Sequence, residues 1–303
     1  MKDKLLLAQK PLVDKYLQQG LKPLSSFSFV SIFAWSDFFD FECIPMGNCL
    51  CVFARGETGC FLYLPPLGGD FNALLLARVF THMAEGRNFK GVNRVENIPE
   101  YLLSAFGGGG YNLYRKPGEY IYLREDLANL SGQAYKSQRH DCNYFLAHYP
   151  GVTFEAFKDQ DYASCMALYE RWAESRASCY SDCVYQAMLE ENRLVHARLL
   201  SFGRELGLVI RVLKVRGKLI GYTFGFVLDA DTFCVYAEIT DLTYTGAAAY
   251  IFKSLCQDVD VKSHTRINTM DDFAMPNVQQ AKGAYHPLAM AISYTASPKQ
   301  GIG

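Results

Sequence analysis

The chain of 303 residues is 50% hydrophobic and 14% aromatic, which excludes a disordered protein and provides apolar residues for two domains. Its formal net charge is −1, and neither half of the chain carries a basic excess. This balance argues against strong, general binding of nucleic acid, and no DNA partner is expected.

The sequence carries no recognisable export signal or membrane span. Met1–Gly20 contains six charged residues, so it lacks the apolar stretch of a signal peptide. No segment approaches the roughly 18–20 apolar residues that span a bilayer. We therefore expect a cytoplasmic protein whose ten cysteines are reduced and mostly buried. The pairs Cys49/Cys51 and Cys179/Cys183 lack companion ligands at zinc spacing, so no metal site is expected.

Hydrophobic periodicity and turn residues divide the first half into short helices and strands. In chain order we first expect helices over Leu5–Gln19 and Ser26–Trp35 and then strands over Asp40–Pro45, Cys49–Ala54 and Cys60–Leu64. The next helix runs to about Glu85, with Asp70 as its N-cap. A strand over Lys90–Val95, a helix over Pro99–Phe106 and a strand over Tyr111–Tyr114 follow.

The second half has stronger periodicity and clearer turns. After the helix-like segment Gln133–Tyr149, we expect a strand over Val152–Phe157, helices over Asp161–Ala177 and Cys183–Leu200, strands over Leu206–Arg216, Leu219–Leu228 and Thr232–Thr240, a helix from Gly246 to Gln257, a strand over Thr265–Asn268, a helix over Met275–Gly283 and a strand over Leu288–Tyr294.

The order β-α-α-β-β-β-α-β-α-β in the second half resembles the GNAT (N-acetyltransferase-like) fold, and residues 1–125 follow nearly the same order. The predicted fold class is therefore a mixed α/β (α+β) protein of two tandem GNAT-like domains. We expect the domains at 1–128 and 151–297, a linking helix at 129–150 and a flexible tail at 298–303.

Several segments, taken together, resemble an uncharacterised bacterial domain family related to the C-terminal domain of phosphatidylglycerol lysyltransferases. Two glycines and an arginine that are usual in that family are replaced by Ala274, Asn277 and Gln279. The matching segments are Phe27–Trp35, Leu64–Gly68, Leu130–Phe145, Tyr236–Asp241, Ile267–Asp272 and Lys282–Pro287.

This resemblance implies tandem GNAT-like domains similar to the Fem-type aminoacyltransferases. Such proteins transfer an aminoacyl group from aminoacyl-tRNA to an amine or hydroxyl of a lipid or of peptidoglycan. We therefore expect an acyl- or aminoacyltransferase without a tightly bound cofactor, whose donor is aminoacyl-tRNA or acyl-coenzyme A. The acceptor would be a lipid, peptide or small molecule. The alternative is a non-catalytic module that senses a phosphorylated metabolite or a nucleotide-type ligand.

Two residues are candidates for proton transfer. Glu238 ends a predicted strand, where a carboxylate could take a proton from an attacking amine, or could simply be an exposed or paired glutamate. Tyr285 follows the last helix, near the position where many GNAT enzymes have a tyrosine that acts as general acid. The alternative is an ordinary core or surface tyrosine, because the chain has 20 tyrosines.

Five polar residues are candidates for substrate binding. Three of them lie near the end of the chain: Asn268, Asp272 and Lys282. Asp272 could instead cap the last helix, or it could form a partly buried pair with Lys282. Lys136 and Arg139 lie on the segment that links the halves. Arg139 suits bidentate contact with phosphate, and the alternative is a solvated helix face on which it pairs with a carboxylate such as Asp141.

The last candidate site is a cofactor loop. In GNAT folds the N-terminus of the helix after the meander binds the pyrophosphate of coenzyme A, and Gly246, Ala247 and Tyr250 occupy that place here. A single glycine without a nearby basic residue is a weak signal. A tight turn with close packing of helix on sheet is an equal alternative.

Overall fold

The structure is a computed structural model that describes residues 2–85, 92–107, 109–179 and 182–299. Its contacts form two compact units. Unit 1 contains residues 1–119, 271–274 and 290–303, and unit 2 contains residues 120–270 and 275–289. This division differs from the expected boundaries near 128 and 150, because the chain enters each unit more than once. Residues 300–303 of the expected tail lie outside the described residues.

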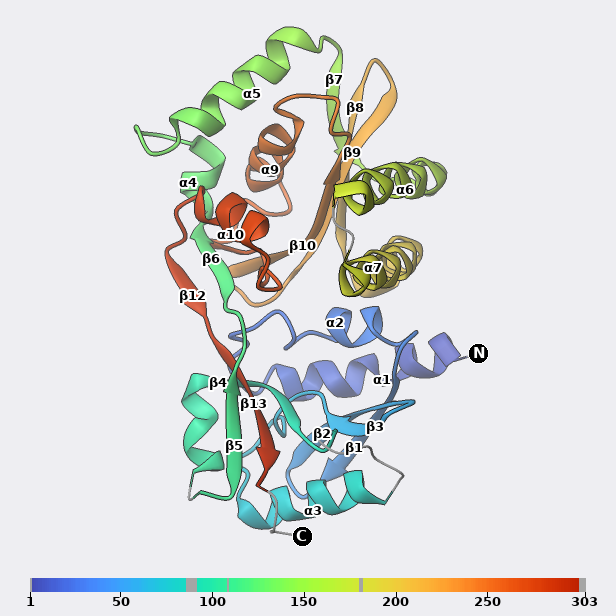
Figure 1. The fold of residues 1–303 in the computed structure, drawn as a ribbon, viewed down its shortest axis with the longest axis vertical. Helices are drawn as coiled ribbons and strands as arrows, with labels where there is room; N and C mark the ends of the chain where they lie inside the picture. Colours follow the sequence, from blue (N-terminus) through green and yellow to red (C-terminus); the bar gives the residue numbers. More distant parts are fainter. Residues whose placement is uncertain (1, 86–91, 108, 180–181, 300–303) are drawn as a thin grey trace. The chain divides into compact units, whose positions relative to one another are not determined.

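Unit 1 is built on a six-stranded sheet in the order β1-β2-β3-β4-β13-β5. Its strand pairs are antiparallel except for β3 and β4, which are parallel and meet at Leu62 and Val95. Helix α1 packs against β1 and β2, and α3 packs against β3 on the other side of the sheet (Figure 1). The elements are β1 (Asp40–Met46), β2 (Cys49–Gly56), β3 (Gly59–Leu62), β4 (Val95–Pro99), β5 (Tyr111–Arg115), β13 (Ser293–Pro298), α1 (Lys2–Leu17), α2 (Phe29–Ala34), α3 (Ala73–Ala84) and the 3₁₀ helix η1 (Glu100–Phe106).

Two local differences from the predicted elements have simple causes. The N-cap of α3 is Asn72, whose side chain accepts a hydrogen bond from the amide of Leu75, so the predicted cap Asp70 is wrong by two residues. The strand expected over Lys90–Val95 begins outside the described residues, and the observed strand β4 starts at Val95.

The second sheet has seven strands in the order β12-β6-β11-β10-β9-β8-β7. Strands β7 to β10 form an antiparallel meander, whereas β10 and β11 are parallel. The elements are β6 (Glu119–Leu123), β7 (Val152–Ala156), β8 (Val209–Val215), β9 (Lys218–Val227), β10 (Thr232–Thr240), β11 (Arg266–Asn268), β12 (Ala289–Ala291), α4 (Arg124–Asn129), α5 (Lys136–His148), the 3₁₀ helix η2 (Asp159–Asp161), α6 (Tyr162–Cys179), α7 (Cys183–Ser201), α8 (Gly203–Leu206), α9 (Ala247–Gln257) and α10 (Pro276–Gly283).

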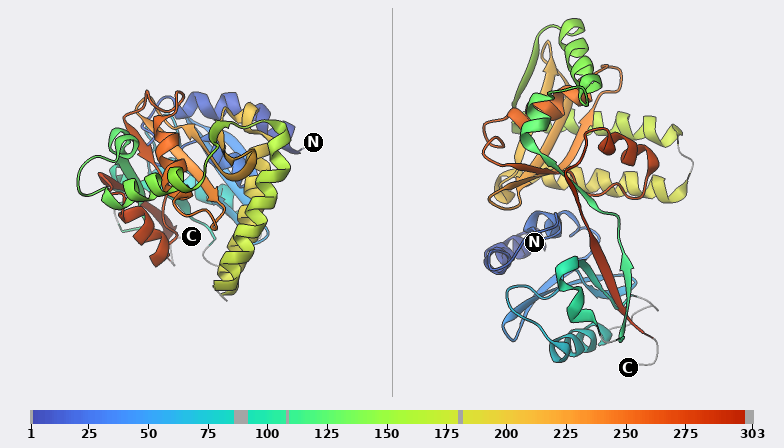
Figure 2. Two further views of the ribbon diagram at one scale, coloured as in Figure 1. Left: turned by 90° about the horizontal axis from the view of Figure 1, so that it is seen from above. Right: turned by 90° about the vertical axis from the view of Figure 1, so that its left-hand side faces the viewer.

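Helices cover both faces of the seven-stranded sheet. On one face, α6 and α7 run side by side (Figures 1 and 2), and His196 of α7 shares a 2.7 Å hydrogen bond with the phenol of Tyr222 in β9. On the other face lies α9: a Cβ on Gly221 of β9 would lie 3.2 Å from Ile251 of that helix. Successive residues of β9 therefore point to opposite helical layers, as expected for a strand buried on both sides.

The two units repeat one architecture. Each has two helices, a meander of antiparallel strands, a crossover helix and a strand parallel to the last meander strand. The crossovers are β3-α3-β4 and β10-α9-β11. This is the order predicted from the sequence, and it confirms a mixed α/β protein of two GNAT-like halves.

The sheets are completed by a reciprocal exchange of strands. Strand β6 follows β5 in sequence but lies between β11 and β12 in the seven-stranded sheet, whereas β13 follows β12 but lies between β4 and β5 in the six-stranded sheet. The single strand predicted over Leu288–Tyr294 is therefore wrong, because it joins parts of two strands in different sheets. At the crossing, a Cβ on Gly118 would lie 2.7 Å from the end of the Ile292 side chain, which would have to shift to admit a larger residue.

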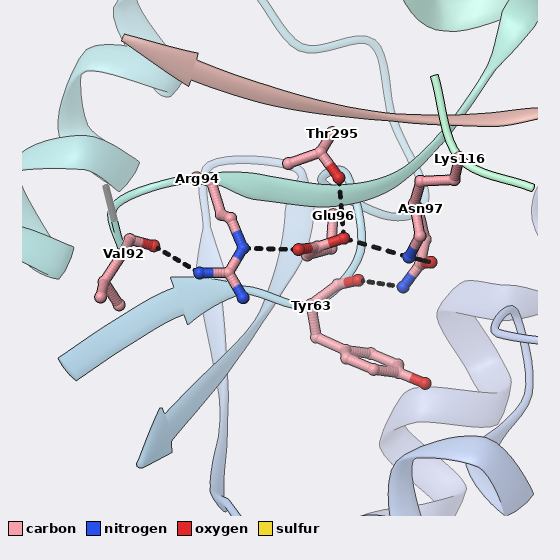
Figure 3. A network of polar contacts seen from close by, with 7 residues as sticks. All are labelled: Tyr63, Val92, Arg94, Glu96, Asn97, Lys116 and Thr295. Carbon is pink, nitrogen blue, oxygen red and sulfur yellow. Dashed lines mark hydrogen bonds and ion pairs between the residues drawn. The ribbon is translucent and has the colours of Figure 1, made fainter. Parts of the chain in front are cut away.

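A network of charged and polar side chains ties β13 into unit 1 (Figure 3). Glu96 of β4 accepts hydrogen bonds from Arg94 (2.5 Å), Lys116 (3.1 Å) and Thr295 of β13 (2.9 Å). Burial by itself raises the pKa of Glu96, but Lys116 and Arg94 outweigh this effect and hold the pKa below its ordinary value. The C-terminal strand thus depends on an ionised, fully engaged carboxylate.

Candidate functional site

The candidate site lies on β10, where a β-bulge interrupts the pairing with β9. The register shifts between Val235 and Ala237, which leaves Tyr236 as an extra residue. Before the bulge, Val235 packs in the core against α9. Strict alternation would direct Glu238 to the opposite face, but the extra residue returns it to the α9 face. In agreement, the charge of Glu238 raises the pKa of Cys256 of α9, in addition to the larger effect of burial.

Glu238 also lies beyond the point where β10 and β11 separate. The parallel ladder includes only Thr232–Cys234 of β10 and Arg266–Asn268 of β11. No other strand of the described chain pairs with the rest of β10 on this side. The edge that carries Glu238 is therefore open within a sheet that is otherwise continuous.

One oxygen of the Glu238 carboxyl group is buried without a partner in the described part of the chain. This oxygen, Oε2, is inaccessible to solvent, although the side chain as a whole is only partly buried. Burial raises the pKa of Glu238 to about 8. A carboxyl group with this pKa exchanges a proton near neutral pH, which is the property that a general acid or base requires.

Tyr285 packs on the α9 face of the sheet in unit 2, the face to which Glu238 also points. Its ring packs edge-on against Phe252 of α9, with 5.1 Å between the ring centroids. Burial, followed by the negative charge of Glu238, raises the pKa of the Tyr285 phenol well above its ordinary value. The two predicted proton-transfer residues thus lie on the same face of the sheet, and the raised pKa keeps the phenol protonated. Their catalytic roles remain predictions.

Side chains outside α10 fix the segment that carries Tyr285. Helix α10 has no buried residue, and carbonyls at and just after its C-terminal end accept hydrogen bonds from side chains elsewhere in unit 2. The sequence analysis missed these donors, although two of them lie in the segment that resembles the known family. The bonds run from Tyr122 Oη to Lys282 O (2.9 Å), from Gln138 Nε2 to Ala284 O (2.8 Å) and from Tyr135 Oη to Tyr285 O (3.2 Å).

Asn268 and Lys282 both hold the turn after β11. Asn268 accepts a hydrogen bond from the amide of Met270 at 2.7 Å. Lys282 donates to the carbonyls of Thr269 (2.6 Å) and Met270 (3.2 Å). Met270 has a φ of 61°, a conformation that needs such local support in a residue other than glycine. Both residues therefore stabilise this turn, and their contact with substrate remains a prediction.

Asp272 belongs to unit 1 and forms a local turn. Its Oδ1 atom accepts the amide of Ala274 at 2.8 Å. The N-cap of α10 is Met275, so the expectation that Asp272 caps this helix is wrong. This hydrogen bond closes an Asx turn just before α10, and a role of Asp272 in substrate binding remains a prediction.

Arg139 and Lys136 lie on α5. Arg139 donates through Nη1 to the carbonyls of Leu130 and Gly132, just after α4. It thereby satisfies carbonyls near the end of that helix, and the pair with Asp141 that was considered as an alternative does not form. Lys136 is exposed at the first residue of α5. An anion contact by either residue remains a prediction.

The predicted coenzyme A loop is closely packed against α5. Gly246 has a φ of 84°, and a Cβ at this position would lie 2.2 Å from the carbonyl oxygen of Asp141. Ala247 is buried, and the ring of Tyr250 lies 5.0 Å from that of Phe145. Each of the three predicted cofactor residues thus has a packing role, and their binding of coenzyme A remains a prediction.

No group of three or more His, Cys, Asp or Glu side chains in the described residues is arranged to hold a metal ion. All ten cysteines carry free thiols. None of the helices in the described ranges is long and apolar enough to cross a bilayer.

The paired GNAT-like halves define the fold class of the protein. The chain belongs to the family described as phosphatidylglycerol lysyltransferase, C-terminal, whose model matches residues 20–297. No curated protein matched the chain.

Solved structures with the same fold cover nearly the whole chain. A conserved protein of unknown function from Bacteroides thetaiotaomicron is 21% identical, with a TM-score of 0.85 and 97% of each chain covered. The C-terminal domain of a putative lysylphosphatidylglycerol synthetase from Agrobacterium fabrum is 12% identical, with a TM-score of 0.66 and coverage of 97% of this chain and 92% of that one. The protein L-PGS from Bacillus licheniformis is 16% identical, with a TM-score of 0.64 and coverage of 89% and 87%. At these identities the likeness establishes the fold.

Proposed function

We propose that this protein is an acyl- or aminoacyltransferase whose reaction takes place beside Glu238 and Tyr285 in unit 2. The observation that carries the proposal is the solvent-inaccessible Oε2 atom of Glu238, which has no hydrogen-bond partner among the described residues and whose side chain shares the α9 face of the sheet with the protonated phenol of Tyr285. Membership of a family named for a lysyltransferase supports the same reaction class.

The reaction needs two proton transfers. A nucleophilic amine or hydroxyl of the acceptor attacks the carbonyl carbon of the donor, and a new C–N or C–O bond forms. Glu238, in its ionised form, takes the proton of the nucleophile directly or through water. The bond between the carbonyl carbon and the carrier then breaks, and the Tyr285 phenol donates a proton to the departing oxygen or sulfur. Positioning of the two substrates supplies the rest of the rate enhancement.

For the donor, we favour an aminoacyl ester such as aminoacyl-tRNA over acyl-coenzyme A. The N-terminal end of α9, where a coenzyme A pyrophosphate would bind in a GNAT fold, is packed against α5 at Gly246 and Asp141. The names of the related synthetases also fit an aminoacyl donor. Acyl-coenzyme A stays the second candidate for the donor.

A donor screen tests the proposal. Thermal stability is measured with acetyl-coenzyme A, a non-hydrolysable aminoacyl-adenylate analogue and charged tRNA, and transfer of a radiolabelled acyl group from each stabilising donor is then followed. We expect Glu238→Gln and Tyr285→Phe to lower transfer by about 10²-fold or more, while the exposed Glu174→Gln control keeps wild-type activity. Absence of stabilisation by every donor would favour the alternative, a non-catalytic module that senses a phosphorylated ligand.

A further inference from the structure

The segment of residues 275–286, which we call the α10 segment, is held in unit 2 more by polar contacts than by packing. No residue of α10 itself is buried. The apolar anchor of the segment is the ring of Tyr285, which packs against the edges of two core clusters. Side chains of Tyr122, Tyr135 and Gln138 hold the segment by bonds to its carbonyls. A segment with so few buried apolar contacts opens at a lower free energy than the core does.

Left-handed backbone conformations lie at both ends of the α10 segment. Just before it, Phe273 and Ala274 have φ angles of 51° and 56°. At its last residue, His286 has a φ of 54°. Residues other than glycine adopt this conformation at an energetic cost, so their surroundings must hold it in place. A few such residues at the ends of an element can absorb the change of backbone angles when the element moves.

The observed position of the α10 segment leaves two buried acceptors without a donor. Glu238 Oε2 and Gln138 Oε1 are inaccessible to solvent and have no hydrogen-bond partner among the described residues. Gln138 holds the segment through the carbonyl of Ala284, and Glu238 points to the sheet face on which Tyr285 packs. Water could satisfy both oxygens if the segment moved away. Opening would therefore recover free energy that the closed position loses.

Two buried thiols belong to the clusters against which Tyr285 packs. Cys142 of α5 lies in the smaller cluster and is 2% exposed, and Cys256 of α9 lies in the larger cluster and is 0% exposed. The negative charge of either thiolate would raise the pKa of Tyr285, so both sulfur atoms lie near its phenol. Cys256 also senses the charge of Glu238. The two thiols therefore report whether this face of the sheet becomes open to solvent.

We propose that the α10 segment is a lid, which opens in the folded protein and admits substrates to Glu238. This inference rests on the proposed function for what the lid admits, whereas the motion itself requires no substrate. In the closed position Tyr285 packs on the α9 face and Glu238 Oε2 is out of reach of solvent. In the open position the carboxyl group is hydrated and accessible. Closure over bound substrates would return the phenol to this face and exclude water from the reaction.

Alkylation of the native cysteines tests the lid. N-Ethylmaleimide is added without donor or acceptor, and modification of each cysteine is followed by peptide mass spectrometry. Cys165 of α6 is the reference, because it is 0% exposed and belongs to the helical layer on the opposite face of the sheet. We expect Cys142 and Cys256 to react at least about tenfold faster than Cys165. Their rates should depend little on low concentrations of urea, whereas that of Cys165 should rise steeply, because local opening exposes less surface than global unfolding.

Matched variants identify the segment that moves. The double variant Tyr122→Phe/Tyr135→Phe removes two phenol-to-carbonyl bonds that hold the α10 segment and keeps both rings. It should speed alkylation of Cys142 and Cys256 by about fivefold or more. Tyr169→Phe removes a bond of the same kind, from Tyr169 Oη to Leu189 O at 2.7 Å, on the α6 side of the sheet. This control should leave the rates of Cys142 and Cys256 within about twofold of the wild type.

Three results would overturn the proposal. They are alkylation of Cys142 or Cys256 no faster than that of Cys165, equally steep dependence of all three rates on urea, or a double variant that reacts no faster than Tyr169→Phe. Circular dichroism and urea denaturation of each variant exclude loss of the fold as the cause. Because no substrate is present, the outcome is separate from that of the transfer assay. Opening without transfer by any donor would refute the proposed reaction and leave the lid standing, and transfer without opening would do the reverse.

Discussion

The carbonyl oxygen of Asp141 occupies the space that a side chain on Gly246 would need. A Cβ on Gly246 would lie only 2.2 Å from this oxygen, and Gly246 also has a φ of 84°. Helix α9 therefore packs against α5 through bare backbone. We expect Gly246→Ala to lower the free energy of unfolding by about 2–4 kcal/mol, because it combines backbone strain with a clash against main-chain atoms. Denaturation by urea measures the change.

Gly283→Ala is the matched control for this substitution. Gly283 ends α10, and nothing lies within 4 Å of a Cβ at that position. This variant should unfold within about 0.5 kcal/mol of the wild type or be slightly more stable. Equal stability of the two variants would show that α5 does not press on Gly246.

A second prediction concerns the stability of the protein as a function of pH. The pKa of Glu238 is raised from 4.5 to about 8 on folding, so between these values the unfolded chain has lost a proton that the folded protein keeps. This group therefore lowers the free energy of unfolding as pH rises from about 4.5 to 8, by at most about 1.4 kcal/mol per pH unit. Glu238→Gln should remove this slope and be more stable than the wild type at pH 8. An unchanged slope would mean that Glu238 is not buried as described.

The same pKa predicts the pH dependence of transfer. If Glu238 is the general base, only its ionised form is active, so the rate should rise about tenfold per pH unit below pH 8 and level off above it. Single-turnover measurements between pH 6 and pH 9.5 would define the curve. Residual activity of Glu238→Gln should lack this inflection. A rate that is independent of pH in wild-type protein would assign the proton transfer to another group.

The contribution of Glu96 to stability should change with pH in the opposite direction to that of Glu238. Its folded-state pKa is held below 4.5 by Lys116 and Arg94, so its contribution is present above the unfolded value and is lost as pH falls through the folded value. We expect Glu96→Gln to lower the free energy of unfolding at pH 7 by about 2–4 kcal/mol, because two cations lose their partner. The variant should also lose less stability than the wild type on acidification, measured by urea denaturation at pH 3–7. Exposed Glu57→Gln serves as the control.

Most elements of the fold could be predicted because they are encoded locally. The meander β8-β9-β10 has alternating apolar residues with short turns between the strands, and both crossover helices have clear apolar faces. The exchange of β6 and β13 could not be predicted, because alternation identifies a strand but not the sheet that it joins. For the same reason Glu119–Leu123 was missed, and Leu288–Tyr294 was read as one strand.

The candidate site was only partly visible in the sequence. Glu238 and Tyr285 were found from their positions in the predicted elements, together with the family resemblance. The bulge at Tyr236 depends on the register between two strands, so no local pattern reveals it. Gln138 and Tyr135 act on carbonyls about 150 residues away, and a single sequence carries no signal for such a contact.

The exchanged strands also constrain how the protein can be made and divided. Strand β13 is an interior strand of the six-stranded sheet, yet it is synthesised after every other strand of the described chain. On the ribosome, that sheet must wait with β4 and β5 unjoined until translation of the C-terminal segment is complete. A fragment that ends before residue 293 should therefore expose two strand edges and aggregate. Neither half can be studied by cutting the chain between them.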